Sequence, residues 1–224
     1  MKKAIALAAI MLFQLVSAQD VTQNLGDFTA IRAFDKIDIL MVKANENKIV
    51  IKGQGKDDIE VVNKNNELKI RMKTTKFLKG DDVSVTLYYK GTIDRVEASE
   101  GSRVASQDIF KATAFTLNAK EGAEIKLNLD VKKLSSKANS GGILNITGKA
   151  NSHDIFITSG GIFNGRELIT EQTAVSINAG GEADVYASEL VDAKTKAGGD
   201  INIYGNPPQV KKNTFAGGRI ETKG

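Results

Sequence analysis

The side chains that offer catalytic chemistry in this 224-residue chain are carboxylates, because it has one histidine and no cysteine. Enzymes that cleave polysaccharides use such carboxylates in groups on one face of the protein. The alternative, which we favour, is that these carboxylates are solvated strand positions, because like charges close together oppose each other's ionisation. We therefore expect no enzyme. The carboxylates at matching positions of neighbouring segments are Glu182, Asp184, Asp200 and Glu221.

Metal chemistry has little support in the sequence. The single histidine, His153, excludes a zinc site with several imidazoles, and its polar surroundings, "KANSHDIF", predict a surface loop. The Gly-Gly-x-Gly-x-Asp repeat of calcium-binding β-rolls is absent after "AGGDINIYG". The pairs Asp57–Asp58 and Asp81–Asp82 lie in turn-like stretches, where aspartate is common for local hydrogen bonding. We expect neither a metal nor another cofactor.

A binding surface is better supported. Amide, carboxylate, basic and tyrosine side chains recur four and six residues after a series of glycine turns, where a strand would point them away from the core. Aromatic rings beside amides and a guanidinium suit sugar rings or a protein partner. Alternatively, the tyrosines fold under the loops that follow them and shield the core. The candidate binding residues are Asn145, Asn164, Arg166, Asp184, Tyr186, Asn202 and Tyr204.

These side chains are positioned by a repeat that is visible in stretches such as "INAGGEADVY" and "TKAGGDINIY". Successive turn glycines are separated by 21, 19, 19, 20, 18 and 19 residues. Such internal periodicity is typical of a solenoid, in which each unit buries its apolar face against its neighbours. The first glycines of the turns are Gly101, Gly122, Gly141, Gly160, Gly180, Gly198 and Gly217.

Apolar residues alternate with polar ones on both sides of each turn, which predicts strand, glycine turn and strand in every unit. Glycine suits these corners because they need positive φ, and because stacked corners bring backbones close together. An antiparallel meander of hairpins would show a similar pattern, but the constant column order favours a right-handed parallel β-helix with coils of about 19 residues. The column three residues after each glycine is Val104, Ile125, Leu144, Phe163, Ala183, Ile201 and Ile220.

The chain divides into three parts on these patterns. Residues 1–18 have two lysines, an apolar run and small residues before Gln19, which is typical of a secretory signal peptide. Residues 19–95 contain alternating segments such as "KIDILMVKA" without the glycine, so we expect opening coils or a capping sheet. Residues 96–224 are the glycine-cornered coils, continuous with the preceding region.

The net charge and the apolar segments of the chain limit the kinds of partner that it can have. Removing the two lysines of the leader lowers the formal net charge from +4 to +2, so no nucleic acid is expected. No second apolar run is long enough to cross a membrane. We expect an exported protein, located in the periplasm or at the cell surface.

The order of these segments resembles the GIN domain, a head domain of adhesins of the autotransporter type that is common in Bacteroidota. The resemblance rests on "FTAIRAFDKIDILMVKANENKIVIKG", "ELKIRM", "DVSVTLYYKGTIDRVEASEGSRV" and the serial Gly-Gly coils, and it covers nearly the whole mature chain. It implies an all-β fold of β-helix type, export and adhesion. It brings no catalytic residues.

The sequence therefore predicts an exported, non-catalytic module that presents a rigid solenoid face to a glycan or a cell-surface protein. The alternative function is a polysaccharide lyase or hydrolase on the same scaffold. A third possibility is an assembly protein that forms oligomers end to end or side by side.

Overall fold

The computed structural model describes residues 20–223, so the predicted signal peptide lies outside the described residues. The described part is all-β apart from two short 3₁₀ turns, Lys56–Asp58 and Thr74–Lys76. The strands are β1 (Val21–Asn24), β2 (Ala30–Ala33), β3 (Asp38–Lys43), β4 (Lys48–Gly53), β5 (Ile59–Lys64), β6 (Glu67–Met72), β7 (Val83–Tyr89), β8 (Arg95–Ala98), β9 (Arg103–Lys120), β10 (Glu124–Asn139), β11 (Ile143–Thr158), β12 (Gly161–Gly165), β13 (Leu168–Asn178), β14 (Gly181–Tyr186), β15 (Leu190–Lys196), β16 (Asp200–Tyr204), β17 (Gln209–Phe215) and β18 (Arg219–Thr222).

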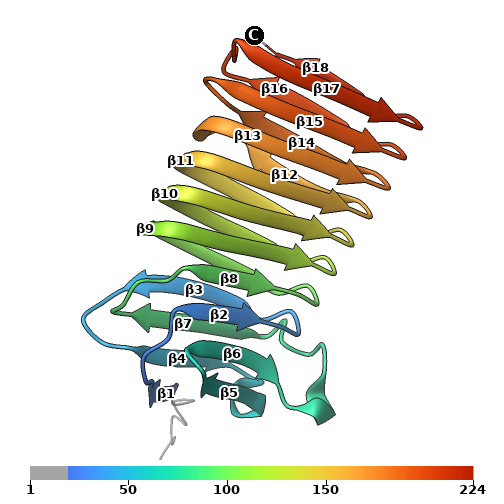
Figure 1. Cartoon of the computed structure of the whole chain (residues 1–224). Coiled ribbons are helices and arrows are strands. Elements are labelled where there is room, and N and C mark those ends of the chain that lie inside the picture. Colours follow the sequence, from blue (N-terminus) through green and yellow to red (C-terminus); the bar gives the residue numbers. More distant parts are fainter. Residues whose placement is uncertain (1–19, 224) are drawn as a thin grey trace, which may run out of the picture.

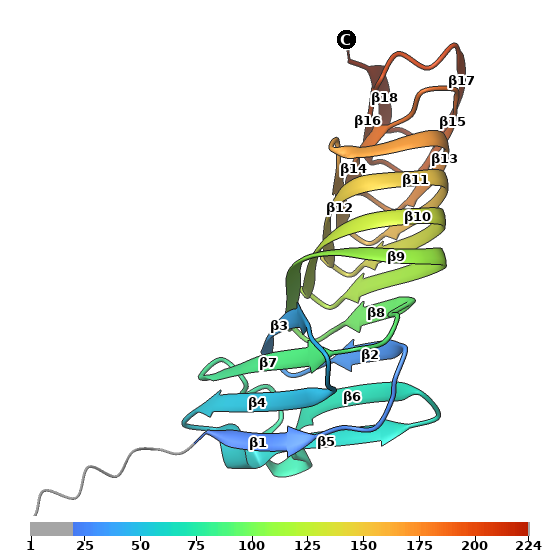
Figure 2. The same ribbon diagram turned by 90° about the vertical axis from the view of Figure 1, so that its left-hand side faces the viewer.

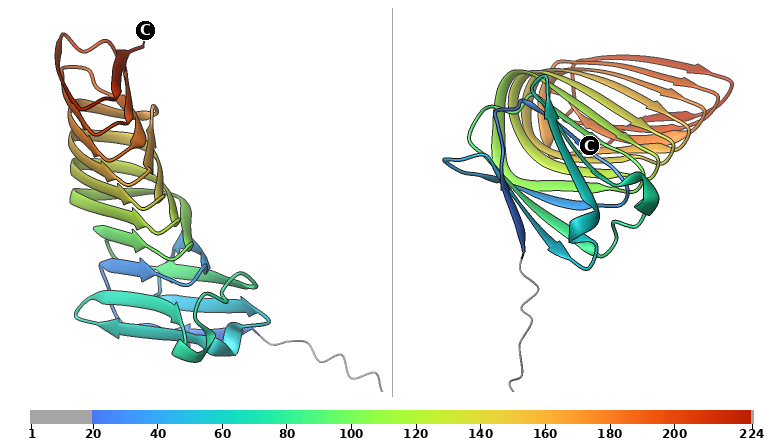
Figure 3. Two further views of the ribbon diagram at one scale, coloured as in Figure 1. Left: turned by 90° about the vertical axis from the view of Figure 1, so that its right-hand side faces the viewer. Right: turned by 90° about the horizontal axis from the view of Figure 1, so that it is seen from below.

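The strands form a right-handed parallel β-solenoid, which confirms the predicted fold class, with about seven turns (Figure 1). Two walls of stacked strands enclose the core, and β9, β10 and β11 bend from one wall into the other (Figure 2). We call the wall that contains β12, β14, β16 and β18 the groove wall, and the wall that contains β13, β15 and β17 the opposite wall. Seen from below, the coils fan out instead of superposing, so the rod twists (Figure 3).

The column register predicted from the glycine spacing is confirmed residue by residue. Val104 pairs with Ile125, Ile125 with Leu144, and the series continues through Phe163, Ala183 and Ile201 to Ile220, always in parallel strands. These side chains are buried, except for the partly exposed one in the last coil. The antiparallel meander is therefore wrong for this part of the chain. Like apolar side chains stack along the axis and form one continuous core.

Each corner contains at least two consecutive residues with positive φ, of which the second is the turn glycine. Ala179 and Gly180, for example, have φ of 57° and 78°. An added Cβ at Gly180 would meet open space, so the glycine is there for its conformation. In another corner the glycine that follows the turn glycine, Gly142, is needed for lack of space. A Cβ there would lie 2.1 Å from the carbonyl oxygen of Ala119. Both expected roles of the glycines are confirmed.

The N-terminal strands form both opening coils and a cap. Strands β2 and β3 make one coil, which pairs in parallel with β8 and β9 above it and with β6 and β7 below it. The chain then reverses, because β4 pairs antiparallel with β7 and with β1, and β5 pairs antiparallel with β6. The buried Asp35 carboxylate accepts the backbone N–H groups of Met72 and Leu78, and so ties the corner of one coil to the coil below.

The C-terminal coil, β17 and β18, ends the rod in a different way. In β17 the inward column positions after Val210 are the exposed, polar Lys212 and Thr214. The ammonium of Lys212 donates to the backbone oxygen of Ile220 in β18, 3.3 Å away, and so spans the end of the coil. Ile201 and Ile203 beneath it remain fully buried. An inward charge is one of the devices that protect an unpaired sheet edge.

The predicted surface position of His153 is wrong. The polar stretch around it is not a loop but the bend of β11, where two inward positions, Ala150 and His153, are three residues apart. His153 is 2% exposed, its Nε2 lies 2.8 Å from the hydroxyl of Ser136, and its ring meets the edge of Phe163. Burial lowers its pKa to about 3, so the ring is neutral at physiological pH.

Candidate functional site

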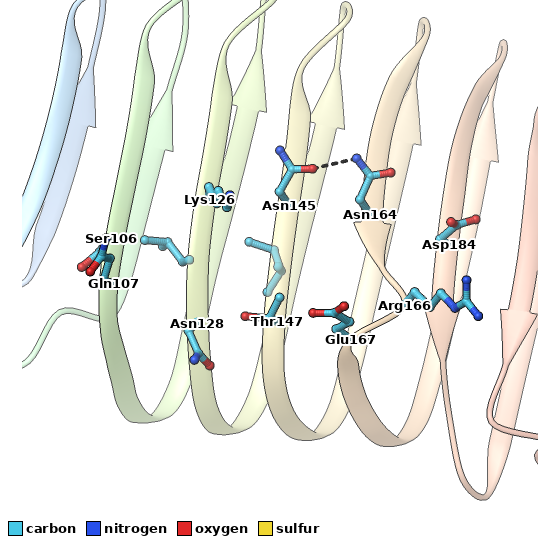
Figure 4. Close-up of a pocket in the computed structure, with 12 residues that line it drawn as sticks. Ser106, Gln107, Lys126, Asn128, Asn145, Thr147, Asn164, Arg166, Glu167 and Asp184 are labelled. Atoms are coloured by element: carbon cyan, nitrogen blue, oxygen red, sulfur yellow. Dashed lines mark hydrogen bonds between the residues drawn. The ribbon is translucent and has the colours of Figure 1, made fainter.

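A hollow of about 390 Å³ lies on the outer surface of the groove wall, across the coils that contain β9 to β14 (Figure 4). We call it the groove. It contains four of the seven predicted binding residues, Asn145, Asn164, Arg166 and Asp184. Tyr186 lies on β14, the strand of Asp184, and Asn202 and Tyr204 lie on the next strand of the same wall, β16. The other lining residues are Ser106, Gln107, Lys126, Leu127, Asn128, Ile146, Thr147 and Glu167.

The N-terminal side of the groove is formed by a β-bulge in β9. Ala105 pairs with Lys126 and Ile109 with Asn128, so three residues of β9 face one residue of β10. These two extra residues account for the longest glycine spacing, 21 residues. A bulge bends its strand and redirects its side chains, which here places Ser106 and Gln107 at the groove.

The bulge is held by Asp108. Its carboxylate accepts the backbone N–H of Lys43 at 2.6 Å and lies 3.4 Å from the hydroxyl of Tyr89. Burial, with a smaller contribution from this carboxylate, raises the pKa of Tyr89 above its usual range. The bulge is therefore fixed to the opening coils and does not depend on the groove for its conformation.

The C-terminal side of the groove is formed by a second irregularity, the turn between β12 and β13. Gly148 of β11 pairs with Leu168, one residue later than a 19-residue repeat would place it. The extra residue lies at Arg166–Glu167, and the backbone oxygen of Glu167 accepts the N–H of Gly148. Between these two irregular coils, β10 and β11 supply a regular floor. Figure 4 shows Gln107 and Arg166 at opposite ends of this floor.

A ladder of amide side chains runs along the groove floor. Asn164 Nδ2 donates to Asn145 Oδ1 at 2.7 Å, and Asn145 Nδ2 donates to Glu124 Oε1 at 2.6 Å. Further along, Asn202 Nδ2 donates to Asp184 Oδ1 at 2.9 Å. Every rung donates toward the N-terminal end of the rod, so the side chains are held in fixed orientations before any partner arrives.

The ladder is interrupted between Asn164 and Asp184, although the two residues are paired in register. No hydrogen bond joins their side chains in residues 20–223, and a carboxylate has no hydrogen to donate. Figure 4 shows the amide oxygen of Asn164 on the side that faces Asp184. We call this interruption the ladder gap.

Arg166 extends beside the gap. Its guanidinium lies over the ring of Tyr204, 4.7 Å from the ring centre, and makes no ion pair among the described residues. Tyr186 is aligned with Tyr204, and its ring lies against the backbone of Gly205. Both tyrosines are half-buried and neither lines the groove. Tyr204 therefore packs against Arg166 and Tyr186 packs against the loop at Gly205, and both rings are only partly exposed to solvent.

The carboxylates considered for catalysis do not all meet in the groove. Asp200 and Glu221 pair with Arg219, and Glu221 also pairs with Lys223. Glu182 lies on the strand that carries Asp184, two residues away. Within residues 20–223, no three histidine, cysteine, aspartate or glutamate side chains come together in a way that would hold a metal ion.

Sequence reasoning missed the remaining residues that line the groove. Ser106, Gln107, Lys126 and Glu167 all line it, and Lys126 makes no ion pair within residues 20–223. Lys126 also borders a second hollow of about 480 Å³ that extends the groove past Leu40 of the opening coil. The signal that could have found Ser106, Gln107 and Glu167 is the coil length, since they lie in the coils with 21 and 20 residues, whereas Lys126 lies in a regular coil.

The family described as "Putative auto-transporter adhesin, head GIN domain" matches residues 27–207. The chain belongs to this family. The match makes this GIN domain an adhesion-type module and fits an exported protein. The last coil lies beyond the matched residues. No curated protein matches the sequence. Among residues 20–223 no helix is long and apolar enough to cross a membrane.

Solved structures share the fold of this GIN domain. A "putative adhesin" from Bacteroides fragilis has a TM-score of 0.82 at 19% identity, covering 92% of this chain and 98% of its own. A second, from Parabacteroides distasonis, has a TM-score of 0.72 at 19% identity, covering 92% and 96%. A protein of the same organism described as a "putative lipid binding protein" has a TM-score of 0.65 at 15% identity, covering 92% and 98%. At these identities the likeness shows the fold alone.

Proposed function

We propose that this GIN domain is an exported, non-catalytic adhesion module that binds a glycan or a cell-surface protein in the groove. The single observation that carries the proposal is the groove itself, a hollow framed by two irregular coils on an otherwise regular wall. Membership of an adhesin-type family supports the same function. Polar side chains in fixed orientations lose little conformational entropy on binding, which favours affinity.

The chemistry of the groove supports recognition more than bond cleavage. Most of its acceptors and donors are amides and hydroxyls, beside two cations and two carboxylates, and the only histidine of the chain is buried in the core. General acid–base catalysis of glycan cleavage needs a pair of carboxyl groups on either side of one bond. Asp184 and Glu167 are the two carboxylates that line the groove, and they come from two different coils.

The test fills the groove and compares it with the opposite wall. Thr147→Arg places a long side chain in the groove, and Ser176→Arg places the same side chain in a hollow on the opposite wall. The two variants and the wild type are applied to a glycan array and to immobilised cell-surface protein from the producing bacterium. We expect Thr147→Arg to weaken binding at least tenfold, and Ser176→Arg to change it less than twofold, at equal melting temperatures.

Three results would contradict the proposal. Equal binding by both variants would remove the groove as the site, and loss of binding in Ser176→Arg alone would move the site to the opposite wall. Cleavage of any arrayed glycan by the wild type would replace a binding module by an enzyme.

A further inference from the structure

The ladder gap leaves hydrogen-bond acceptors facing each other with no donor between them. The hydrogen bond to Asn145 turns Asn164 Nδ2 away from Asp184, so Asn164 Oδ1 faces the gap. Asp184 Oδ1 accepts from Asn202, and its second oxygen accepts no hydrogen bond within residues 20–223. Residues paired on neighbouring parallel strands lie about 4.8 Å apart. Two acceptors at that spacing need donors from outside the chain.

We propose that the ladder gap is a subsite for two neighbouring hydroxyl groups of one sugar unit, an inference that rests on the function proposed above. Each hydroxyl donates one hydrogen bond, one to Asn164 Oδ1 and one to Asp184. A hydrogen bond to a charged acceptor is stronger than one between neutral groups, so Asp184 contributes the larger share of binding. Because the two acceptors differ, the subsite favours one orientation of the bound sugar along the rod.

Arg166 decides between a sugar and a positively charged peptide. An ammonium group also donates hydrogen bonds to a carboxylate, but the guanidinium of Arg166 lines the same hollow and has no carboxylate partner among the described residues. A second cation would be repelled there. A sugar provides both donors for the gap and acceptors for the guanidinium. Those acceptors are hydroxyl and ring oxygens in a neutral glycan, and a carboxylate in an acidic one.

The ring of Tyr204 fixes the position of Arg166 in advance. The contact of 4.7 Å between the guanidinium and the ring centre is a cation–π interaction, which restrains a long, exposed side chain. Tyr204 therefore acts through Arg166 as a positioning residue. This role explains how a tyrosine two coils further along the rod affects a groove that it does not line.

The decisive variant is Asp184→Asn, which keeps the size of the side chain and supplies the missing donor. The new amide can donate to Asn164 Oδ1 and still accept from Asn202, so the ladder becomes continuous and the gap is closed. We expect the melting temperature to stay equal or rise, while affinity for the probes falls at least tenfold. The probes are immobilised mannan, a neutral polymer, and polygalacturonate, an acidic one, and the measurement is surface plasmon resonance.

The matched control is Glu182→Gln, which removes one negative charge from an exposed side chain two residues from Asp184, outside both the ladder and the groove lining. We expect its affinity to stay within twofold of the wild type. Normal binding by Asp184→Asn together with loss of binding by Thr147→Arg would overturn the subsite and leave the groove in place. Normal binding by both variants would contradict the groove as well.

Three further outcomes would overturn the proposal. A wild type that binds neither polymer shows that the gap does not take sugar hydroxyl groups. A wild type that binds poly-L-lysine and not the polysaccharides shows that a cationic peptide fills the gap. Loss of polysaccharide binding on addition of EDTA shows that a metal ion bridges the two acceptors instead. If binding is retained in EDTA, the choice between mannan and polygalacturonate tells whether Arg166 contacts a neutral oxygen or a carboxylate.

Discussion

The two ends of the rod end the same kind of stack by different means. At the N-terminal end the chain reverses direction, and the antiparallel strands β1, β4 and β5 cover the opening coils. At the C-terminal end the strands remain parallel, and three inward positions of the last coil, Lys212, Thr214 and Thr222, are polar. Both solutions leave the core between them sealed. At the N-terminal end, antiparallel strands cover the core. At the C-terminal end, the last coil covers the core itself, because its exposed inward side chains are polar.

This comparison shows that the burial of an inward position decides which side chains it accepts, because positions of the same inward column can have different side chains. Ala193 is fully buried, whereas Lys212, its partner in the next coil, is exposed. The same column thus contains an alanine in the interior and a charged lysine at the end. A charge costs several kcal/mol inside the protein and little where water reaches it.

The largest expected effect contrasts one substitution at two depths. Ile201→Asp puts an unpaired charge into a fully buried column, and we expect it to lower the free energy of unfolding by at least about 3 kcal/mol. Thr222→Asp, at an inward but exposed position of the last coil, should change it by less than about 0.5 kcal/mol. Chemical denaturation measures both, and equal losses would show that the last coil is as sealed as the interior.

A smaller effect is expected at the N-terminal end. Asp35→Ala removes the acceptor of two backbone N–H groups, those of Met72 and Leu78, and we expect a loss of about 2–3 kcal/mol in the free energy of unfolding. Asp35→Asn keeps one acceptor oxygen and tolerates the positive φ of this corner, so its loss should be smaller. Thermal melting followed by circular dichroism gives the order. If Asp35→Ala has the same melting temperature as the wild type, the hydrogen bonds of Asp35 between the two coils do not stabilise the fold.

The smallest expected effect on stability concerns the other end. Lys212→Val makes the inward face of the last coil apolar without touching the core, so the free energy of unfolding should change by less than about 0.5 kcal/mol. The unpaired edge loses its inward charge, and we expect the average particle mass in light scattering to rise with concentration above that of the wild type. An unchanged mass would show that the lysine does not protect this end.

Much of the fold was predictable because a solenoid repeats its register. Once the glycine anchors were aligned, the inward column that begins at Val104 followed, and the structure confirms its pairings as far as Ile220. Four of the predicted binding residues lie together in the groove for the same reason. Alternation along a strand, combined with a fixed period along the axis, determines both the face and the neighbours of a side chain.

The errors lie where the strand bends or the period changes. At the bend of β11 the inward positions Ala150 and His153 are three residues apart, and the polar residues around His153 led to the wrong prediction of a surface loop. Alignment with Val131 and Leu134, which occupy the same places one coil earlier, would have corrected it. The groove itself depends on the extra residues of two coils, and their positions within the coil were not marked by any glycine.

The direction of the backbone hydrogen bonds has a mechanical consequence for a protein that holds on to a surface. They join each coil to the next, so they run along the rod. Tension applied between the two ends is carried by every layer in series, so the layer with the fewest contacts separates first while the others keep their shape. Tension applied across the rod shears neighbouring strands past each other, and the many hydrogen bonds between two coils then resist it together.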